Sequence, residues 1–165
     1  MPDRLPDPPE HRSSPRSVIR TERLVLRPYD QDEAEAVLAG NRAGRAWAQG
    51  FPREDDKDAV RAFLRSTNAE PTFTVHQMVL RETGEVIGGI GFFGPPDETG
   101  TAEFGYGIAP EYEGRGLTTE AVRGLLARAF EDDRLRRLVA GTTLDNIGSQ
   151  RVMEKAGMTR GRADK

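Results

Sequence analysis

Two glycines stand between the end of a predicted strand and the start of a predicted amphipathic helix. Residues 108–121 read IAPEYEGRGLTTEA, which places Gly114 and Gly116 in the turn. Such a turn directs consecutive backbone N–H groups into one concavity, and the helix start adds unpaired donors and partial positive charge. A Cβ at either glycine would obstruct an anion that approaches the backbone. The stretch therefore predicts an anion site, and it favours a diphosphate.

The residues around this turn agree with an anion site. Thr118 and Thr119 are natural N-caps, whose hydroxyl groups can also reach a phosphate oxygen, and Arg115 adds a mobile cation. The turn lacks the Gly-Lys-Ser/Thr ending of a P-loop. It also lacks the third glycine and the ribose-binding acid of a dinucleotide site. The alternative is that the glycines serve only a tight strand–helix connection.

Hydrophobic periodicity divides the rest of the chain into a β meander and several helices. We expect strands at residues 19–26, 72–80, 86–93, 101–108 and 138–143, and helices at residues 30–40, 55–66, 118–132 and 146–156. Residues 1–17 are rich in Pro, Arg, Asp and Ser, so we expect a disordered tail there. The remaining residues, 18–165, are expected to form a single domain.

Composition excludes several function classes. The chain has no cysteine, which excludes disulfides, thiolate metal sites and a cysteine nucleophile. It has only two histidines, His11 and His76. A net charge of −3 argues against a nucleic-acid binder. No apolar run approaches the roughly 20 residues of a membrane span, and the N-terminus lacks the apolar region of a secretory signal. We therefore expect a cytoplasmic protein without a membrane partner.

A second motif lies near the C-terminus. Residues 146–158 read NIGSQRVMEKAGM, and the spacing of Asn146 and Ser149 places both polar groups on one face near a helix start. The alternative is that Asn146 only caps the helix and Ser149 has no role.

Together with TERLVLR at residues 21–27, these two stretches resemble the GNAT N-acetyltransferases, and within them the RimJ/RimL-like branch. The resemblance covers roughly residues 19–161. It implies an α+β, three-layer fold with a mixed, mostly antiparallel central sheet flanked by helices. It also implies acetyl-CoA as co-substrate, no metal, and direct attack of a primary amine on the thioester.

The resemblance assigns roles to particular positions. The strand before the glycine turn, at residues 106–109, would splay from its neighbour and pair with the pantetheine arm. The implied cofactor-binding residues are Ile108, Ala109, Glu113, Gly114, Arg115, Gly116, Leu117, Thr118, Asn146 and Ser149.

Three residues are candidates for catalysis. The resemblance implies Glu103 as the candidate base, acting through a water, and Ser149 as the candidate acid that protonates the leaving thiolate. Met153 stands where many family members carry a tyrosine acid, so Tyr106 is the remaining tyrosine candidate. Alternatives stay open: Glu103 as a solvated cross-strand charge, and Tyr106 as a core aromatic residue.

The chain departs from the family pattern in two places. Glu111 stands where the family usually has Gln or Arg. The residues after Gly157 are too few for the family's final β hairpin, which leaves an unpaired strand edge. Completion by a second subunit, as a homodimer, is one hypothesis, and a shortened chain is the other.

The acceptor is an amine, either a small molecule or a protein N-terminus. We expect its site to form from residues 30–70 and 94–100. The acidic run Glu54, Asp55 and Asp56 can attract a cation, although a helix start in solvent also explains it. A rival hypothesis is a non-catalytic, CoA-binding remnant that lacks the final hairpin.

Overall fold

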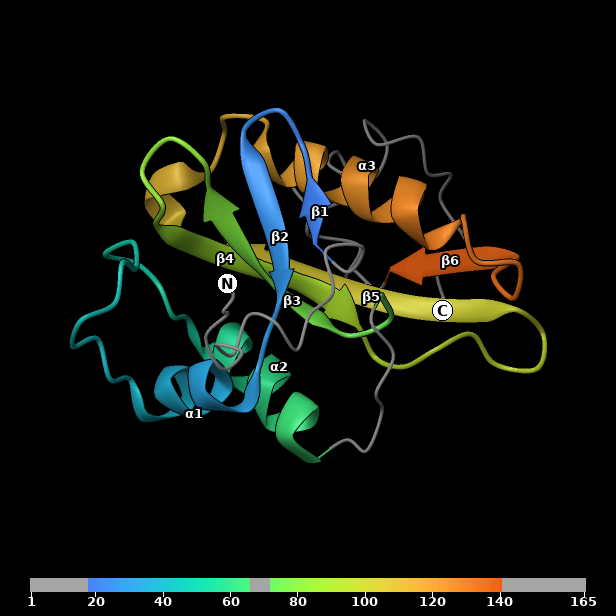
Figure 1. The fold of residues 1–165 in the computed structure, drawn as a ribbon, viewed down its shortest axis with the longest axis horizontal. Helices are drawn as coiled ribbons and strands as arrows, with labels where there is room; N and C mark the ends of the chain where they lie inside the picture. The colour runs from blue at the N-terminus through green and yellow to red at the C-terminus, as the bar shows by residue number, and fades with distance from the viewer. Residues whose placement is uncertain (1–17, 66–71, 141–165) are drawn as a thin grey trace, which may run out of the picture.

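Alternating and continuous apolar runs build one mixed sheet. The computed structural model describes residues 18–65 and 72–140, and in these ranges six strands lie in chain order across the sheet (Figure 1). The strands are β1 (Ile19–Arg20), β2 (Leu24–Pro28), β3 (Val75–Leu80), β4 (Val86–Phe92), β5 (Thr101–Ile108) and β6 (Arg137–Ala140). Neighbours are antiparallel except β5 and β6, which are parallel. The predicted mixed, mostly antiparallel sheet is confirmed.

The first predicted strand is two strands joined by a tight turn. Ile19 pairs with Leu26 in antiparallel register, so the chain reverses between β1 and β2. Thr21 makes the reversal: its N–H donates to the Leu24 carbonyl at 2.9 Å, and its Oγ1 accepts the Leu24 N–H at 3.1 Å. Threonine hydroxyls favour such local turns over a continued strand, which explains why the single-strand prediction for residues 19–26 was wrong.

The helices begin and end close to the predicted positions. They are α1 (Gln31–Ala39), α2 (Glu54–Arg65) and α3 (Leu117–Ala129). Asp30 caps α1 by accepting the Glu33 N–H at 2.8 Å, and Gly40 ends it with φ of 67°. Both ends therefore follow the ordinary capping rules.

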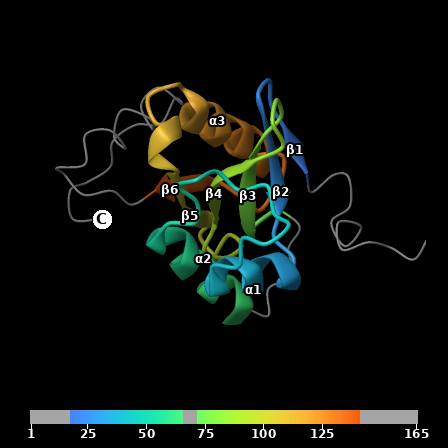
Figure 2. The same cartoon turned by 90° about the vertical axis from the view of Figure 1, so that its left-hand side faces the viewer.

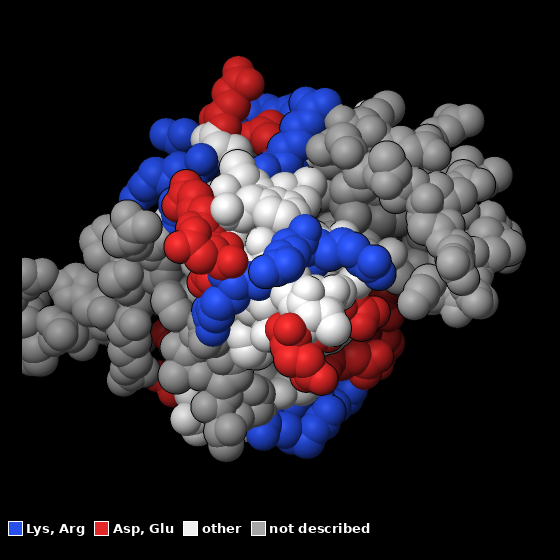
Figure 3. Space-filling model, turned by 90° about the vertical axis from the view of Figure 1, so that its right-hand side faces the viewer, with Lys and Arg blue, Asp and Glu red and all other residues white. Residues whose placement is uncertain are grey.

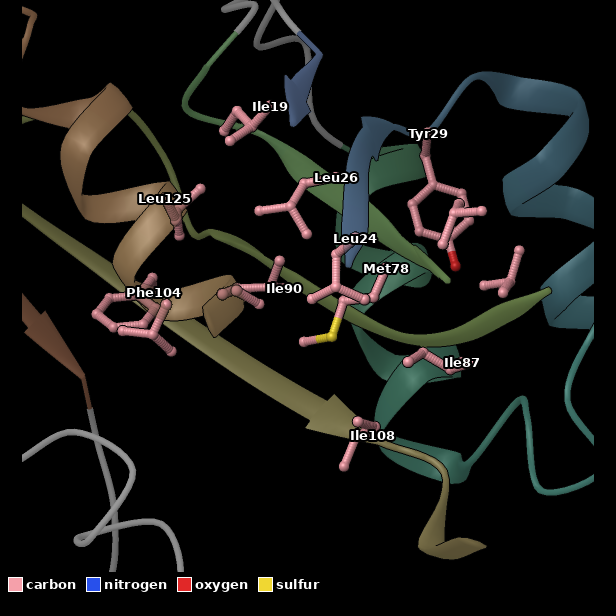
Figure 4. Packing of buried hydrophobic residues seen from close by; sticks show 14 of the residues in the cluster. Ile19, Leu24, Leu26, Tyr29, Met78, Ile87, Ile90, Phe104, Ile108 and Leu125 are labelled. Atoms are coloured by element: carbon pink, nitrogen blue, oxygen red, sulfur yellow. The ribbon is translucent and has the colours of Figure 1, made fainter. Parts of the chain in front are cut away.

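The helices form layers on both faces of the sheet. Figure 2 shows α3 on one face and α1 with α2 on the other. Leu125 of α3 faces Leu26 and Ile90 of the sheet (Figure 4), and all three side chains are buried. Burial of each such side chain contributes about 1.5–3 kcal/mol. The three-layer α+β fold that the resemblance implied is thus confirmed.

The parallel pair β5 and β6 covers only half of β5. Residues Thr101 to Phe104 pair with Arg137 to Ala140. Within the described residues, the second half of β5, 105–108, pairs on one side only, with β4. The predicted strand residues 141–143, the predicted helix 146–156 and the expectation about the final hairpin fall outside the described residues.

Candidate active site

The glycine turn leads from β5 into α3. A single 3₁₀ turn, Pro110–Tyr112, follows β5, and the chain then passes through Gly114 and Gly116 with φ of 79° and 78°. Such φ values favour glycine strongly. Gly116 occupies the N-cap position of α3, and a Cβ at Gly114 would meet no atom of the described residues within 4 Å. No described side chain therefore blocks the approach to the turn at Gly114.

No side chain of the described residues caps the start of α3. The prediction that Thr118 or Thr119 serves as N-cap was wrong, because both lie inside the first turn and Gly116 takes the cap position. The Glu120 N–H makes the first helical bond, to the Gly116 carbonyl at 3.1 Å. An uncapped helix start presents N–H groups and partial positive charge, which is the ordinary requirement for an anion site.

Glu120 links the glycine turn to the β1–β2 turn through hydrogen bonds. Its carboxylate accepts the hydroxyl of Thr21, the backbone N–H of Arg23 at 2.6 Å and the Arg23 Nε–H at 2.7 Å. Arg23 also donates from Nη1 to the Arg115 carbonyl at 3.0 Å. Burial raises the pKa of Glu120, but the hydrogen bonds from Thr21 and Arg23 outweigh it, so this pKa lies below its usual value. Sequence reasoning missed Glu120, whose partners lie almost a hundred residues away.

Two charged side chains flank the turn. Arg115 donates to the Glu111 carbonyl at 3.1 Å, and its guanidinium lies 5.1 Å from the centre of the Tyr112 ring. The Glu111 carboxylate accepts the Gly50 N–H at 2.8 Å, and this hydrogen bond lowers its pKa. Glu111, which replaces the usual Gln or Arg, therefore binds the segment before α2.

The other predicted residues of this region occupy β5 and its end. Ile108 and Ala109 are buried, and the Ala109 N–H donates to the Ile87 carbonyl at 2.7 Å. Glu103 is exposed. Tyr106 is half-buried, with its ring 6.3 Å from that of Phe104. Asn146 and Ser149 lie outside the described residues.

A pocket of about 370 Å³ lies between α2 and the sheet. Its lining includes Gly89, Gly91, Gly105 and Gly107, which form two cross-strand pairs, Gly89 with Gly107 and Gly91 with Gly105. Residues two apart on a strand share a face, so this part of the sheet carries no side chain. We call these four residues the glycine floor. Glycines inside strands often mark a site of close approach by a ligand.

The walls of the pocket are aromatic and acidic. Its aromatic side chains come from Tyr29, Phe63 and Phe93, and its acids are Asp55, Asp56 and Asp58. Phe92 and Tyr106 also line the pocket, but they alternate with the floor glycines, so their side chains lie on the opposite face of the sheet. The candidate base Glu103 does not line the pocket. His76 is buried outside the pocket, with Nδ1 3.2 Å from the Thr74 carbonyl.

Asp56 is buried, against the expectation of a solvated acidic helix start. It is only 5% exposed, and its Oδ2 accepts the Arg53 N–H at 2.8 Å. Burial raises its pKa to about 6, although the hydrogen bond and the positive charge of Arg53 oppose this shift. The acidic run itself gave no signal that its third member turns inward.

The described part of the chain shows neither a metal-ligand cluster nor a membrane-spanning helix. It contains no cluster of three His, Cys, Asp or Glu residues that could hold a metal ion. Nor does any helix there have the length and apolarity that crossing a membrane requires. On the face drawn in Figure 3, acidic and basic side chains are interspersed and neither sign covers the surface.

Comparison with known proteins decides the family. The model of the acetyltransferase (GNAT) domain matches residues 23–159. This chain belongs to the GNAT acetyltransferases. The acetyltransferase is 29% identical over 152 residues to YjdG of Bacillus subtilis, named an uncharacterized N-acetyltransferase, with coverage of 85% of this chain and 88% of the relative.

Solved structures agree with this assignment. A Vibrio cholerae chain, described as a candidate ribosomal-protein-serine acetyltransferase, superposes with a TM-score of 0.64 at 26% identity, covering 88% of this acetyltransferase and 84% of that chain. RimL, a ribosomal L7/L12 α-N-protein acetyltransferase solved with coenzyme A, has the same fold at 17% identity, with a TM-score of 0.63 and coverage of 85% and 82%.

The comparisons confirm the GNAT resemblance, with its RimJ/RimL-like branch, and an acetyl-CoA-dependent acetyltransferase. They do not support the rival hypothesis of a non-catalytic remnant.

Proposed function

We propose that this enzyme transfers the acetyl group of acetyl-CoA to the nitrogen of a primary amine, which attacks the thioester directly. One observation carries the proposal. Residues 105–107 line the pocket, and the same strand, β5, leads directly into the glycine turn at the start of α3. A donor held at this turn and an acceptor in the pocket would therefore meet along one short strand segment.

The chain's own groups fit the donor. Backbone N–H groups of residues 114–118 would hold the diphosphate, because no side chain of the described residues caps the helix start and a Cβ at Gly114 would meet none of their atoms within 4 Å. The Glu113 N–H donates to the Pro110 carbonyl at 3.1 Å, so Glu113 would contact the diphosphate by another group. The segment at Ile108 and Ala109, where the Ala109 N–H donates to the Ile87 carbonyl, would lie along the pantetheine arm. We also propose that Asn146 and Ser149 bind acetyl-CoA. When bound, acetyl-CoA supplies an acetyl thioester.

Catalysis requires two proton transfers. As the nitrogen–carbon bond forms and the carbon–sulfur bond breaks, the nitrogen loses a proton to a base and the thiolate gains one from an acid. We propose Glu103, through water, as the base and Ser149 as the acid, with Tyr106 as the other candidate donor. Of these, Tyr106 is among the pocket-lining residues, with its side chain on the face of the sheet opposite the glycine floor.

Acetyl-CoA binding and amine turnover test the proposal together. Calorimetry on the purified chain is expected to show micromolar binding of acetyl-CoA, and amine-dependent thiol release is expected to follow. A thiol reagent can measure this release without background, because the chain has no cysteine. Binding without turnover of any amine would favour the non-catalytic alternative, and a folded chain that does not bind acetyl-CoA would refute the proposal. The same sample gives the oligomeric state, which tests the hypothesis of completion by a second subunit.

A further inference from the structure

The pocket holds one feature that acetyl transfer in general does not require, which is the buried carboxylate of Asp56. Carboxylates are rarely buried to this extent unless they are paired. Asp56 is 5% exposed and lines the pocket above the glycine floor. A Cβ at Gly89 would lie 3.3 Å from its Oδ1. The carboxylate thus lies directly against the floor.

The two oxygens of Asp56 have different surroundings. Oδ2 accepts the backbone N–H of Arg53, the residue before α2, as in the capping box of a helix start. The hydrogen bond to this carboxylate within the described residues goes to Oδ2, and Oδ1 accepts none there. Capping accounts for one oxygen and leaves the second available to a donor in the pocket. Capping also requires no burial, because most capping acids are solvated.

No basic side chain of the described residues forms an ion pair with the Asp56 carboxylate. The nearest cation on its own helix start is Arg53, whose Nη2 forms an ion pair with Asp55 at 3.1 Å. The groups that act on Asp56 are Arg53 and Asp55, and Asp56 in turn raises the pKa of Tyr29 across the pocket. Burial, with contributions from Asp56 and Glu33, keeps the Tyr29 hydroxyl protonated. A cationic ligand would complete this arrangement.

We propose that Asp56 binds the ammonium group of the acceptor, and that the acceptor is a compact primary amine with an apolar body. This inference rests on the proposed function and adds the substrate class and a specificity-determining residue. The floor without side chains accepts a flat apolar body, and Tyr29, Phe63 and Phe93 enclose it. A volume near 370 Å³ falls at the small end of ligand pockets, which span about 300–1,000 Å³.

The test compares 2-phenylethylamine with its uncharged analogue 2-phenylethanol. Both are titrated calorimetrically into the chain saturated with coenzyme A, using the natural chain, Asp56→Asn and Glu54→Gln. Asp56→Asn keeps an oxygen for the Arg53 N–H and removes only the charge. Glu54→Gln removes the same charge from the same helix turn, at a side chain that is 81% exposed and does not line the pocket.

The natural chain is expected to bind the amine at least about tenfold more tightly than the alcohol, and Asp56→Asn to abolish this preference. Glu54→Gln is expected to retain it, and coenzyme A affinity to stay within about twofold in both variants. An equal preference in Asp56→Asn and the natural chain, or no amine binding at all, would overturn the inference while leaving the proposed function intact. Failure to bind coenzyme A would instead refute the proposed function.

Turnover separates a compact amine from a peptide. Rates are measured with 2-phenylethylamine, benzylamine and an octapeptide that has a free N-terminus. We expect the small amines to show the higher kcat/KM and Asp56→Asn to raise their KM more than it lowers kcat. A higher kcat/KM for the octapeptide would overturn the assignment of a compact acceptor.

Discussion

The guanidinium of Arg53 lies against Gly107, so that a Cβ on this glycine would collide with Nη1. Nη1 is buried and, among the described residues, has no hydrogen-bond partner. Arg53 precedes α2, and Gly107 belongs to the glycine floor, so the contact joins the start of the helix to the sheet. The pocket therefore depends on the absence of a side chain at residue 107.

Gly107→Ala is expected to lower the free energy of unfolding by about 1–3 kcal/mol, because the added methyl group displaces the Arg53 side chain. Urea unfolding of the single and double variants measures the coupling. In an Arg53→Ala background the cost of Gly107→Ala should fall below about 0.5 kcal/mol. An equal cost in both backgrounds would mean that the glycine serves the strand rather than the contact.

Gly116→Ala is expected to weaken acetyl-CoA binding by at least about tenfold, since its left-handed φ of 78° disfavours alanine and the Cβ obstructs the diphosphate. The matched donor is S-acetylpantetheine, which lacks the diphosphate. Its kcat/KM should change by less than about threefold if the variant is folded. Equal losses with both donors would show that the glycine acts on the whole site instead of on the diphosphate.

Glu120→Gln is expected to flatten the dependence of stability on acidic pH. The pKa of Glu120 is depressed in the folded state. Its contribution is therefore present above the unfolded pKa and is lost as the pH falls through the folded value. Urea unfolding between about pH 6 and pH 3 should show a steeper acid loss for the natural chain than for the variant. Parallel curves would mean that the bonds to Thr21 and Arg23 do not favour the charged form.

Local patterns predicted the elements of this fold well. The strand at residues 101–108 and the helix start at Asp30 follow from alternation and capping, which depend on residues close in sequence. The reversal at Thr21 was missed because the apolar residues on either side suggested a single strand. The glycine turn was predicted from its two glycines, whereas its cap was assigned to threonines that lie two and three residues after the N-cap position.

The candidate site was predictable only in part. The donor side is contiguous in sequence, so the positions around Gly114 could be assigned. The residues of the acceptor side are not contiguous in sequence. Strand register brings Gly89 opposite Gly107, and α2 places Asp56 against Gly89. In the acidic run at the start of α2, Asp55 is exposed and Asp56 is buried. The rotation of α2 about its own axis decides which of these side chains is buried. A run of three acidic residues does not indicate that rotation.

A buried carboxylate retained for a ligand should destabilise the free protein. The pKa of Asp56 is raised by burial to about 6, so the folded state holds this proton more tightly than the unfolded state. As the pH rises from about 4 to about 6, the unfolded chain ionises first and stability falls. Above this window both states are ionised, and the full cost of the buried charge is present.

Asp56→Asn is therefore expected to be more stable than the natural chain at about pH 7, by about 1–3 kcal/mol, although it binds amines less well. Urea unfolding from about pH 4 to pH 7.5 should show this difference growing up to about pH 6 and then remaining constant. Glu54→Gln, which removes an exposed charge, should show no such growth. If Asp56→Asn were instead less stable at neutral pH, the carboxylate would act chiefly as the cap of α2, and its burial would need no ligand to explain it.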